Sequence, residues 1–232
     1  MKIRPLSQEG LKLIACITML TDHVGMFFPM WPWMRLVGRI AFPIYCFLLS
    51  EGVQYTSDPR KYGLRLTAGM LLSEYPFDLL LWGGPALRGQ SVMVTLLLGF
   101  FMLEVMKKID FLPGKLLAAA PFALAAELLH GDYGAQGVMM ILLFGLAKDC
   151  GLSLAMQTVG LGILSLVFPG WRIPLLGLQV PAELFCIFSM VPIALYSGKK
   201  TTAGPGVQWA FYLFYPVHLL MLGIYLRWIL GY

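Results

Sequence analysis

Charged side chains are scarce in this sequence of 232 residues: they make up 12% of it, against 59% hydrophobic residues. That charged fraction is about half the value of an ordinary soluble domain. A water-soluble chain of this length needs a charged exterior, and the residues to build one are missing here. The composition therefore excludes an ordinary soluble protein and predicts that the apolar runs lie in lipid.

Cysteine is also rare, and Cys16, Cys46, Cys150 and Cys186 all lie inside apolar runs. They lack metal-binding spacings such as C-x-x-C, so they are predicted to be small buried residues, and neither a disulfide framework nor a metal site is expected. The net charge of +5 is explained by basic loops on the cytoplasmic side of a membrane protein. A nucleic acid partner is therefore not expected.

Apolar runs bounded by polar, Gly or Pro clusters indicate membrane spans of about 20 residues. The predicted fold class is all-α: a polytopic transmembrane helical bundle of about nine spans, forming a single domain over residues 1–232. The first run contains Asp22 and His23 and ends in Phe27-Phe28-Pro29 instead of a small-residue cleavage site, so we expect it to stay in the mature protein. The predicted spans are 11–28, 35–55, 62–82, 92–106, 116–129, 136–150, 152–169, 180–197 and 207–230.

The distribution of lysine predicts the orientation. With the amino terminus in the cytoplasm, every lysine falls on the inner side, and of the 17 basic residues twelve lie inside and five outside. This asymmetry predicts an inner amino terminus and, because the number of spans is odd, an outer carboxyl terminus. The five outer basic residues are all arginines, which suit fixed pairing with carboxylate or phosphate. They are Arg35, Arg39, Arg88, Arg172 and Arg227.

Ionisable residues gather in the outer half of the predicted bundle. A charge inside a span is costly unless it is paired or faces water, so each is a functional candidate. Arg35 and Arg39 open the second span and share a helix face, as do Glu74 and Asp78 in the third. The two pairs are expected to neutralise each other, or the arginines to hold an anionic part of a substrate as well. The other outer groups are Asp22, His23, Glu127, His130, Asp132 and Glu183.

His23 lies about one turn below the outer end of the first span, next to Asp22. An ordinary histidine changes its charge near neutral pH, so it can take a proton from an amine or hydroxyl and return it to a leaving thiolate. Asp22 lies about 100° round the helix from His23, so the carboxylate that orients the ring can also be Glu74, Asp78 or Asp132. The alternative is a histidine that only hydrogen-bonds within the bundle.

Two further polar features lie on or beside the apolar runs. His218 lies near mid-membrane on the ninth span, after Tyr215-Pro216. Pro216 is expected to free a backbone carbonyl and kink the helix, with His218 capping that carbonyl. The loop 131–137, which includes Asp132 and Tyr133, offers backbone donors beside a carboxylate. It is predicted to be either a tight turn or a lip over the site.

Short motifs throughout the chain, in order, resemble the TraX family. The Asp22-His23 pair and the element Arg35-x-x-Gly38-Arg39-x-x-Phe42-Pro43 are the most specific of them. The others are Leu11-Lys12-Leu13-Ile14-Ala15, Met19, Gly52, Tyr62, Arg65-Leu66, Thr95-Leu96-Leu97-Leu98-Gly99, Asp132-Tyr133-Gly134-x-x-Gly137 and Phe214-Tyr215-Pro216-x-His218-Leu219.

The resemblance implies a chemistry. TraX-like proteins are associated with conjugation, where the named member acetylates the amino terminus of pilin. The family is also similar to larger transmembrane acyltransferases in which a histidine on an early span is catalytic, and His23 corresponds to it. The predicted catalytic residues are therefore His23, Asp22 and Asp78. The predicted substrate- and cofactor-binding residues are Arg35, Arg39, Glu74, Asp132, Tyr133, His218, Arg65 and Lys61.

The expected protein is a multi-pass acetyltransferase of the bacterial cytoplasmic membrane. It would move an acetyl group from cytosolic acetyl-CoA to an amine or hydroxyl of an extracytoplasmic acceptor, which is a peptide amino terminus or a small molecule. The alternatives are a small proton-coupled transporter or flippase and a non-catalytic assembly factor. The nucleotide of acetyl-CoA is expected at inner basic residues, unless these only set the topology: Arg60, Lys61, Arg65, Lys107 and Lys108.

Overall fold

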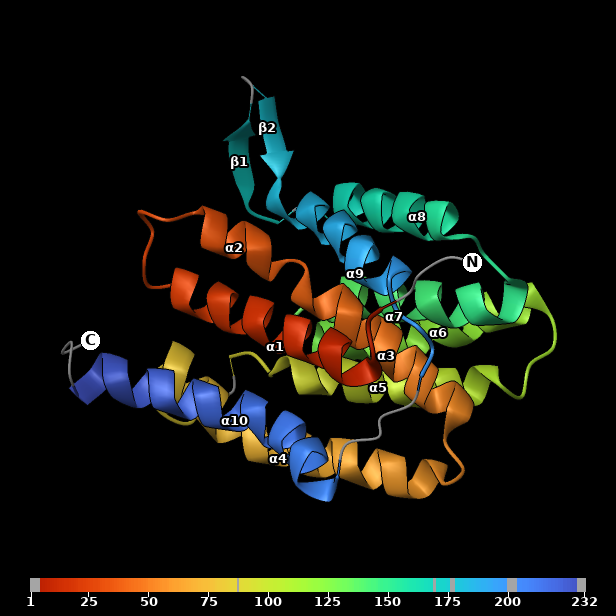
Figure 1. Ribbon diagram of the computed structural model, residues 1–232, viewed down its shortest axis with the longest axis horizontal. Coiled ribbons are helices and arrows are strands. Elements are labelled where there is room, and N and C mark those ends of the chain that lie inside the picture. The colour runs from red at the N-terminus through yellow and green to blue at the C-terminus, as the bar shows by residue number, and fades with distance from the viewer. Residues whose placement is uncertain (1–4, 87, 169, 176–177, 200–203, 229–232) are drawn as a thin grey trace. The chain divides into compact units, whose positions relative to one another are not determined.

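The computed structural model describes residues 5–86, 88–168, 170–175, 178–199 and 204–228, and most of these residues are helical (Figure 1). Each of the predicted apolar runs overlaps a helix or a pair of consecutive helices. The elements are α1 (Gln8–Gly25), α2 (Trp33–Gly38), α3 (Ala41–Tyr55), α4 (Pro59–Leu81), α5 (Val92–Met106), α6 (Leu112–Leu128), α7 (Gly134–Cys150), α8 (Leu154–Val167), β1 (Arg172–Leu175), β2 (Leu178–Pro181), η1 (Ala182–Ser189), α9 (Met190–Ala194) and α10 (Pro205–Trp228).

A small hairpin departs from the all-α prediction. Strands β1 and β2 pair antiparallel, with Arg172 opposite Pro181 and Leu175 opposite Leu178 (Figure 1). Ile173 and Val180 face each other across the pair, and β-branched residues favour such positions. The predicted eighth span therefore starts too early, because residues 180 and 181 belong to β2 and the helical path begins only at Ala182.

Local capping residues explain where several helices begin. The Ser7 hydroxyl accepts from the Gly10 N–H at 3.2 Å and so caps α1. The Asp58 carboxylate accepts from the Lys61 N–H at 3.0 Å at the start of α4. The Ser153 hydroxyl caps α8 in the same way. Each cap satisfies a backbone donor that the first helical turn leaves unpaired.

The contacts divide the chain into two compact units, of which the first comprises Met1–Phe47 and Leu146–Phe211. In it α1 runs antiparallel to α2 and the start of α3. A Cβ built at Gly25 would lie 2.7 Å from the Met34 side chain, and Cys16 contacts the Tyr45 hydroxyl at 3.3 Å. The fully buried residues of this unit include Leu11, Ile44 and Leu161. The close packing of these helices thus buries an apolar core in the first unit.

The second unit comprises Leu48–Gly145 and Tyr212–Tyr232, and its helices alternate in direction. Helices α4 and α5 are antiparallel, with Gly63 against Phe100 at one end and Glu74 bonded to Ser91 at the other. Helices α4 and α10 lie side by side and run parallel (Figure 1), because Arg65 stacks near Tyr212 and Leu79 packs on Gly223. Helices α5 and α7 are parallel as well, since Gly99 lies against Ile141 and Leu103 against Gly145.

The exposed surface of the described helices is largely apolar. On α6, Leu117, Leu124 and Leu128 are 74%, 61% and 69% exposed, and α8 exposes a similar row. Contiguous exposed apolar surface on this scale marks contact with a membrane or a partner. By length and composition, the helical stretches Trp33–Tyr55 and Gly206–Trp228 can cross a membrane, while Val92–Met106, Leu154–Val167 and Ala182–Ala194 are apolar but shorter.

The cysteines follow the prediction with one exception. All four are free thiols, and Cys16, Cys46 and Cys186 are buried. Cys150 is exposed, so the prediction of a buried residue is wrong there. It is the last residue of α7, where the helix gives way to the turn at Gly151, and a side chain at a helix end has fewer neighbours to bury it.

Candidate functional site

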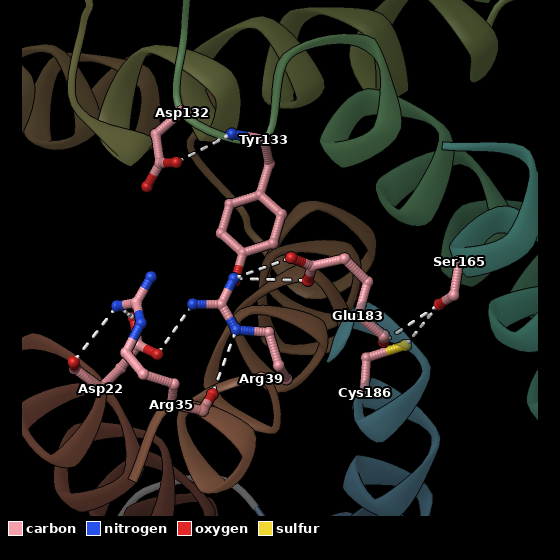
Figure 2. Close-up of polar contacts among 8 residues, drawn as sticks. All are labelled: Asp22, Arg35, Arg39, Asp132, Tyr133, Ser165, Glu183 and Cys186. Carbon is pink, nitrogen blue, oxygen red and sulfur yellow. Dashed lines mark hydrogen bonds and ion pairs between the residues drawn. The ribbon is translucent and has the colours of Figure 1, made fainter. Parts of the chain in front are cut away.

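Four charged side chains form a network at one end of the first unit (Figure 2). The Asp22 carboxylate, near the end of α1, bonds two arginines: its Oδ2 lies 2.7 Å from Arg35 Nη1, and its Oδ1 lies 2.7 Å from Arg39 Nη2. Arg39 Nη1 reaches Glu183 Oε1 at 3.1 Å. The network holds two positive and two negative groups, so it is neutral as a whole and suited to a largely buried position.

Arg39 is fixed more firmly than Arg35. Its Nε donates to the Arg35 carbonyl at 3.2 Å and its two terminal nitrogens bond two carboxylates, with the side chain only 11% exposed. Arg35 bonds Asp22 through Nη1 alone, to the carboxylate and to the carbonyl, and its side chain is 27% exposed. Among the described residues, nothing bonds the Nε and Nη2 of Arg35. The guanidinium of Arg35 therefore keeps donors for a ligand.

Glu183 joins this network from η1. Its backbone carbonyl accepts from the Ser165 hydroxyl of α8 at 3.1 Å, and the same hydroxyl contacts Cys186 Sγ at 3.3 Å (Figure 2). Ser165 is fully buried and also donates to the Leu161 carbonyl at 2.9 Å. The sequence placed Glu183 among the outer polar residues without a role, and the structure shows it as the second carboxylate of the network.

Gly38 explains how the network can form. A Cβ atom built on Gly38 would overlap the Asp22 side chain, so only glycine lets the end of α2 approach α1 closely. This approach places Arg39, the next residue, within reach of Asp22. The Gly38-Arg39 step of the sequence motif thus has a geometric reason.

Within the first unit, the arginines pair with carboxylates that the sequence did not assign to them. That they also neutralise Glu74 and Asp78, which belong to the second unit, stays a prediction. Both arginines form their ion pairs with Asp22, and Arg39 also pairs with Glu183. Depth along the chain placed all these residues at the same end of the predicted spans, but depth alone does not select the partner. Asp22 is selected because α1 and α2 pack closely at Gly38.

His23 follows Asp22 in the last turn of α1 and is partly buried. Its backbone carbonyl accepts from the Met26 N–H at 3.3 Å. The network therefore lies next to the predicted general base, His23. Both carboxylate oxygens of Asp22 are already paired with arginines.

Polar groups also gather at one end of the second unit, around the start of α5. The Ser91 hydroxyl donates to Glu74 Oε1 at 2.6 Å, and the Ser91 N–H also points to this carboxylate. Glu74 thus lies at the positive end of the α5 dipole. The Thr95 hydroxyl donates to the Asp132 carbonyl at 2.5 Å. The buried phenol of Tyr215 hydrogen-bonds Ser91 and lies near Glu74 and Asp132.

Asp78 is buried one turn after Glu74. Its Oδ2 accepts from the Ala86 N–H at 2.9 Å, while its buried Oδ1 has no hydrogen-bond partner among the described residues. A buried carboxylate oxygen without a donor is unfavourable. Asp78 Oδ1 can therefore accept a hydrogen bond from a ligand.

The loop after α6 has a defined, unusual backbone. His130 and Tyr133 have positive φ angles of 52° and 63°, and Gly134 has 42°. The Asp132 carboxylate accepts from the Tyr133 N–H at 3.1 Å (Figure 2), and Glu127 accepts from the Ala135 N–H at 3.0 Å at the start of α7. The loop is therefore a tight, capped turn, and whether it forms a lip over the site stays a prediction.

His218 is buried on α10 and bonds its own helix. Its Nδ1 lies 2.7 Å from the Phe214 carbonyl, and its ring stacks on that of Phe214. The prediction that His218 caps the carbonyl freed by Pro216 stays a prediction, since the bond to Phe214 is made to a carbonyl two residues before the proline. A carbonyl only accepts, so Nδ1 carries the proton and Nε2 is the acceptor nitrogen of the neutral ring.

The basic residues predicted to hold acetyl-CoA have different environments. Arg65 lies over the rings of Tyr62 and Tyr212, at 5.6 and 6.0 Å. Lys107 donates to the Val53 carbonyl at 2.6 Å and pairs with Glu104 at 2.7 Å. Arg60, Lys61 and Lys108 are exposed. Among the described residues, no group of three His, Cys, Asp or Glu side chains could hold a metal ion.

Comparison with known proteins agrees with the motifs. The family model described as "TraX protein" matches residues 7–226. The "Probable fimbrial assembly protein FimC, serogroup H1" of Dichelobacter nodosus is 30% identical over 234 residues, covering 91% of this chain and 92% of that protein. An uncharacterised protein of Rickettsia prowazekii (strain Madrid E) is 46% identical over 54 residues, 23% of this chain and 21% of that protein. No solved structure matches. This chain belongs to the TraX family.

Proposed function

We propose that the chain crosses the bilayer nine times, with its amino terminus in the cytoplasm and its carboxyl terminus outside. The alternating directions of the helices support this. In the second unit α4 and α10, the third and ninth predicted spans, are parallel, and both are antiparallel to α5, the fourth. Odd-numbered spans share one direction if every intervening run crosses, and a single run that failed to cross would make them antiparallel. The exposed leucines of α6 and the inner lysines support the same arrangement.

We infer that the protein is an acetyltransferase that acts in the assembly of fimbriae or pili. The observation that carries this inference is the match to the TraX family over residues 7–226, together with a relative named as a probable fimbrial assembly protein. The donor is cytosolic acetyl-CoA. The acceptor is an amine or hydroxyl of a peptide or small molecule on the outer side. The protein is embedded in the lipid bilayer of the bacterial cytoplasmic membrane, and the bilayer is its proposed partner.

In this proposal His23 is the general base. Its ring nitrogen takes the proton from the acceptor amine or hydroxyl as that group attacks the thioester carbonyl. The carbon–sulfur bond then breaks, and the protonated ring returns the proton to the CoA thiolate.

Arg35 is the residue that binds the negative charge of the reacting group or of the acceptor. Its Nε and Nη2 remain available among the described residues, and Asp22 fixes the opposite side of the guanidinium. Arg39 and Glu183 act as positioning residues, because Arg39 holds Asp22 from the other side and Glu183 holds Arg39. Preorganised donors of this kind stabilise developing charge without rearranging during the reaction.

The second unit supplies the predicted acceptor-binding groups, Glu74, Asp78, Asp132, Tyr133 and His218. Asp78 has an unpartnered carboxylate oxygen that can accept a hydrogen bond from an acceptor, and Asp132 lies on a rigid turn. Exposed Arg60 and Lys108 are proposed to bind the CoA phosphates. Whether Asp78, Glu74 or Asp132 orients His23 stays a prediction.

A proton-coupled transporter or flippase is the second candidate, favoured by one observation. The second unit buries His218, and it also buries Asp78 Oδ1, which has no hydrogen-bond partner among the described residues. Ionisable groups inside the membrane relay protons in transporters. In an acetyltransferase these groups serve substrate binding instead. The two candidates differ in whether acetyl-CoA is consumed.

The test uses the purified protein in liposomes of phosphatidylcholine and phosphatidylglycerol. Acetyl-CoA is supplied on one side and a membrane-impermeant peptide with a free amino terminus on the other, and acetylated peptide is measured by mass spectrometry. The proposal predicts acetylation with stoichiometric release of CoA. Collapse of a pH gradient without any CoA release would contradict it and favour the transporter.

A further inference from the structure

One exposed face of α4 carries two cations at its amino-terminal end, followed by an apolar row. The members recur every three or four residues and so line one side of the helix. We call this set the α4 stripe: Lys61, Leu64, Arg65, Ala68, Leu71, Leu72 and Tyr75. Leu64, Leu71 and Leu72 are 70%, 66% and 58% exposed. The α4 stripe is thus an unpartnered helix face with charge at one end.

Arg65 is held in place by rings and not by a carboxylate. Its guanidinium carbon lies 5.6 Å from the centre of the Tyr62 ring and 6.0 Å from that of Tyr212. Within the described part of the chain, no carboxylate forms an ion pair with Lys61 or Arg65. Stacking on rings fixes a guanidinium while leaving its hydrogen-bond donors available. These donors are therefore available to an anion.

The dimensions of the α4 stripe match one leaflet of a bilayer. Arg65 and Tyr75 are ten residues apart, which corresponds to about 15 Å along a helix. The hydrocarbon of a bilayer is about 30 Å thick, so one leaflet provides about half of that. Neighbouring α10, parallel to α4, exposes Leu213, Val217 and Met221 over the same depth. An acyl chain beside Arg65 would therefore run along leucines for its whole length.

We propose that the α4 stripe binds one anionic phospholipid. The phosphate accepts hydrogen bonds from Arg65 and Lys61, and an acyl chain lies along Leu64, Leu71 and Leu72. This inference rests on the membrane placement proposed above and not on acetyl transfer. It also gives Arg65 and Lys61 a different ligand from the CoA predicted by the sequence. A lipid is favoured because the residues beyond Arg65 are exposed apolar side chains, which suit an acyl chain and offer a nucleotide no hydrogen bonds.

The test compares lipid binding by the full chain purified in dodecyl maltoside. Phosphatidylglycerol and phosphatidylcholine are titrated separately, and the bound lipid is counted by native mass spectrometry. The variants are Arg65→Gln, the conservative Arg65→Lys, and Arg88→Gln as a matched control. Arg88 is also an exposed arginine over an aromatic ring, Trp82 at 5.8 Å, but it lies outside the α4 stripe. Circular dichroism verifies that each variant is folded.

The inference predicts that the wild-type chain prefers phosphatidylglycerol and that Arg65→Gln weakens this binding about fivefold, the effect of one cation at a lipid surface. Arg65→Lys should retain most of it, and Arg88→Gln all of it. Equal binding by wild type and a folded Arg65→Gln variant would overturn the inference. So would displacement of the lipid by free CoA, which would assign the site to the nucleotide. A chain that holds the lipid at Arg65 but transfers no acetyl group would refute the proposed function and leave this inference standing.

Discussion

Removing Arg39 should destabilise the first unit more than removing any other single arginine. The structure gives Arg39 ion pairs with Asp22 at 2.7 Å and with Glu183 at 3.1 Å, and the three side chains are 11%, 14% and 13% exposed. Arg39→Ala would leave Glu183 without its ion-pair partner in a poorly hydrated position. Breaking a buried pair from one side costs about 3–5 kcal/mol.

This cost translates into a measurable melting shift. For chains of this length about 1 kcal/mol corresponds to about 2–4 °C, so a loss near the lower bound lowers the melting temperature by about 6–12 °C. The assay is thermal unfolding in detergent, followed by tryptophan fluorescence. The double variant Arg39→Met with Glu183→Gln should recover much of the loss, because no unpaired charge then remains at Glu183. Arg88→Ala is the control and should melt like the wild type. A folded Arg39→Ala variant with the same melting temperature as this control and the wild type would refute the reasoning.

Three further predictions test separate parts of the structure. A reporter fused to the carboxyl terminus should be extracytoplasmic and one inserted after Lys199 cytoplasmic, and finding both on one side would exclude the nine-span arrangement. Gly38→Ala should lower the melting temperature and the activity together, because its Cβ overlaps Asp22, whereas Gly162→Ala, where a Cβ meets nothing within 4 Å, should change neither. His218→Gln should leave acetyl transfer above about one tenth of wild type if the residue only bonds the Phe214 carbonyl; a loss of about 10²-fold or more, typical of a general base, would give His218 the role assigned to His23.

The apolar runs were enough to predict the helices, but not the hairpin or the exposure of single residues. Runs such as 92–106 coincide with a helix because few polar residues interrupt them. The hairpin at Arg172–Pro181 was missed because two short strands leave a weak pattern between helical runs. Likewise, Cys150 lies inside an apolar run by sequence, yet a helix end exposes it.

The sequence predicted which residues gather at the candidate site better than it predicted which of them form ion pairs. The sequence placed Asp22, Arg35 and Arg39 at one end of the predicted spans, and these three do meet. The pairing of both arginines with Asp22 was not predicted, because spacing on a helix shows which residues share a face, but not which neighbouring helix that face meets. The close approach at Gly38 decides this, and the motif that contains Gly38 was the available signal.

The most direct test of the central claim measures CoA release by the purified protein in detergent, with acetyl-CoA and a peptide acceptor, for His23→Gln and a matched histidine control. His130→Asn is that control: His130 is exposed, and asparagine tolerates its positive φ of 52°. The account predicts that His23→Gln lowers turnover by at least about 10²-fold while acetyl-CoA binding and the melting temperature stay close to wild type, and that His130→Asn is unaffected. Near-normal turnover by a folded His23→Gln protein would contradict it.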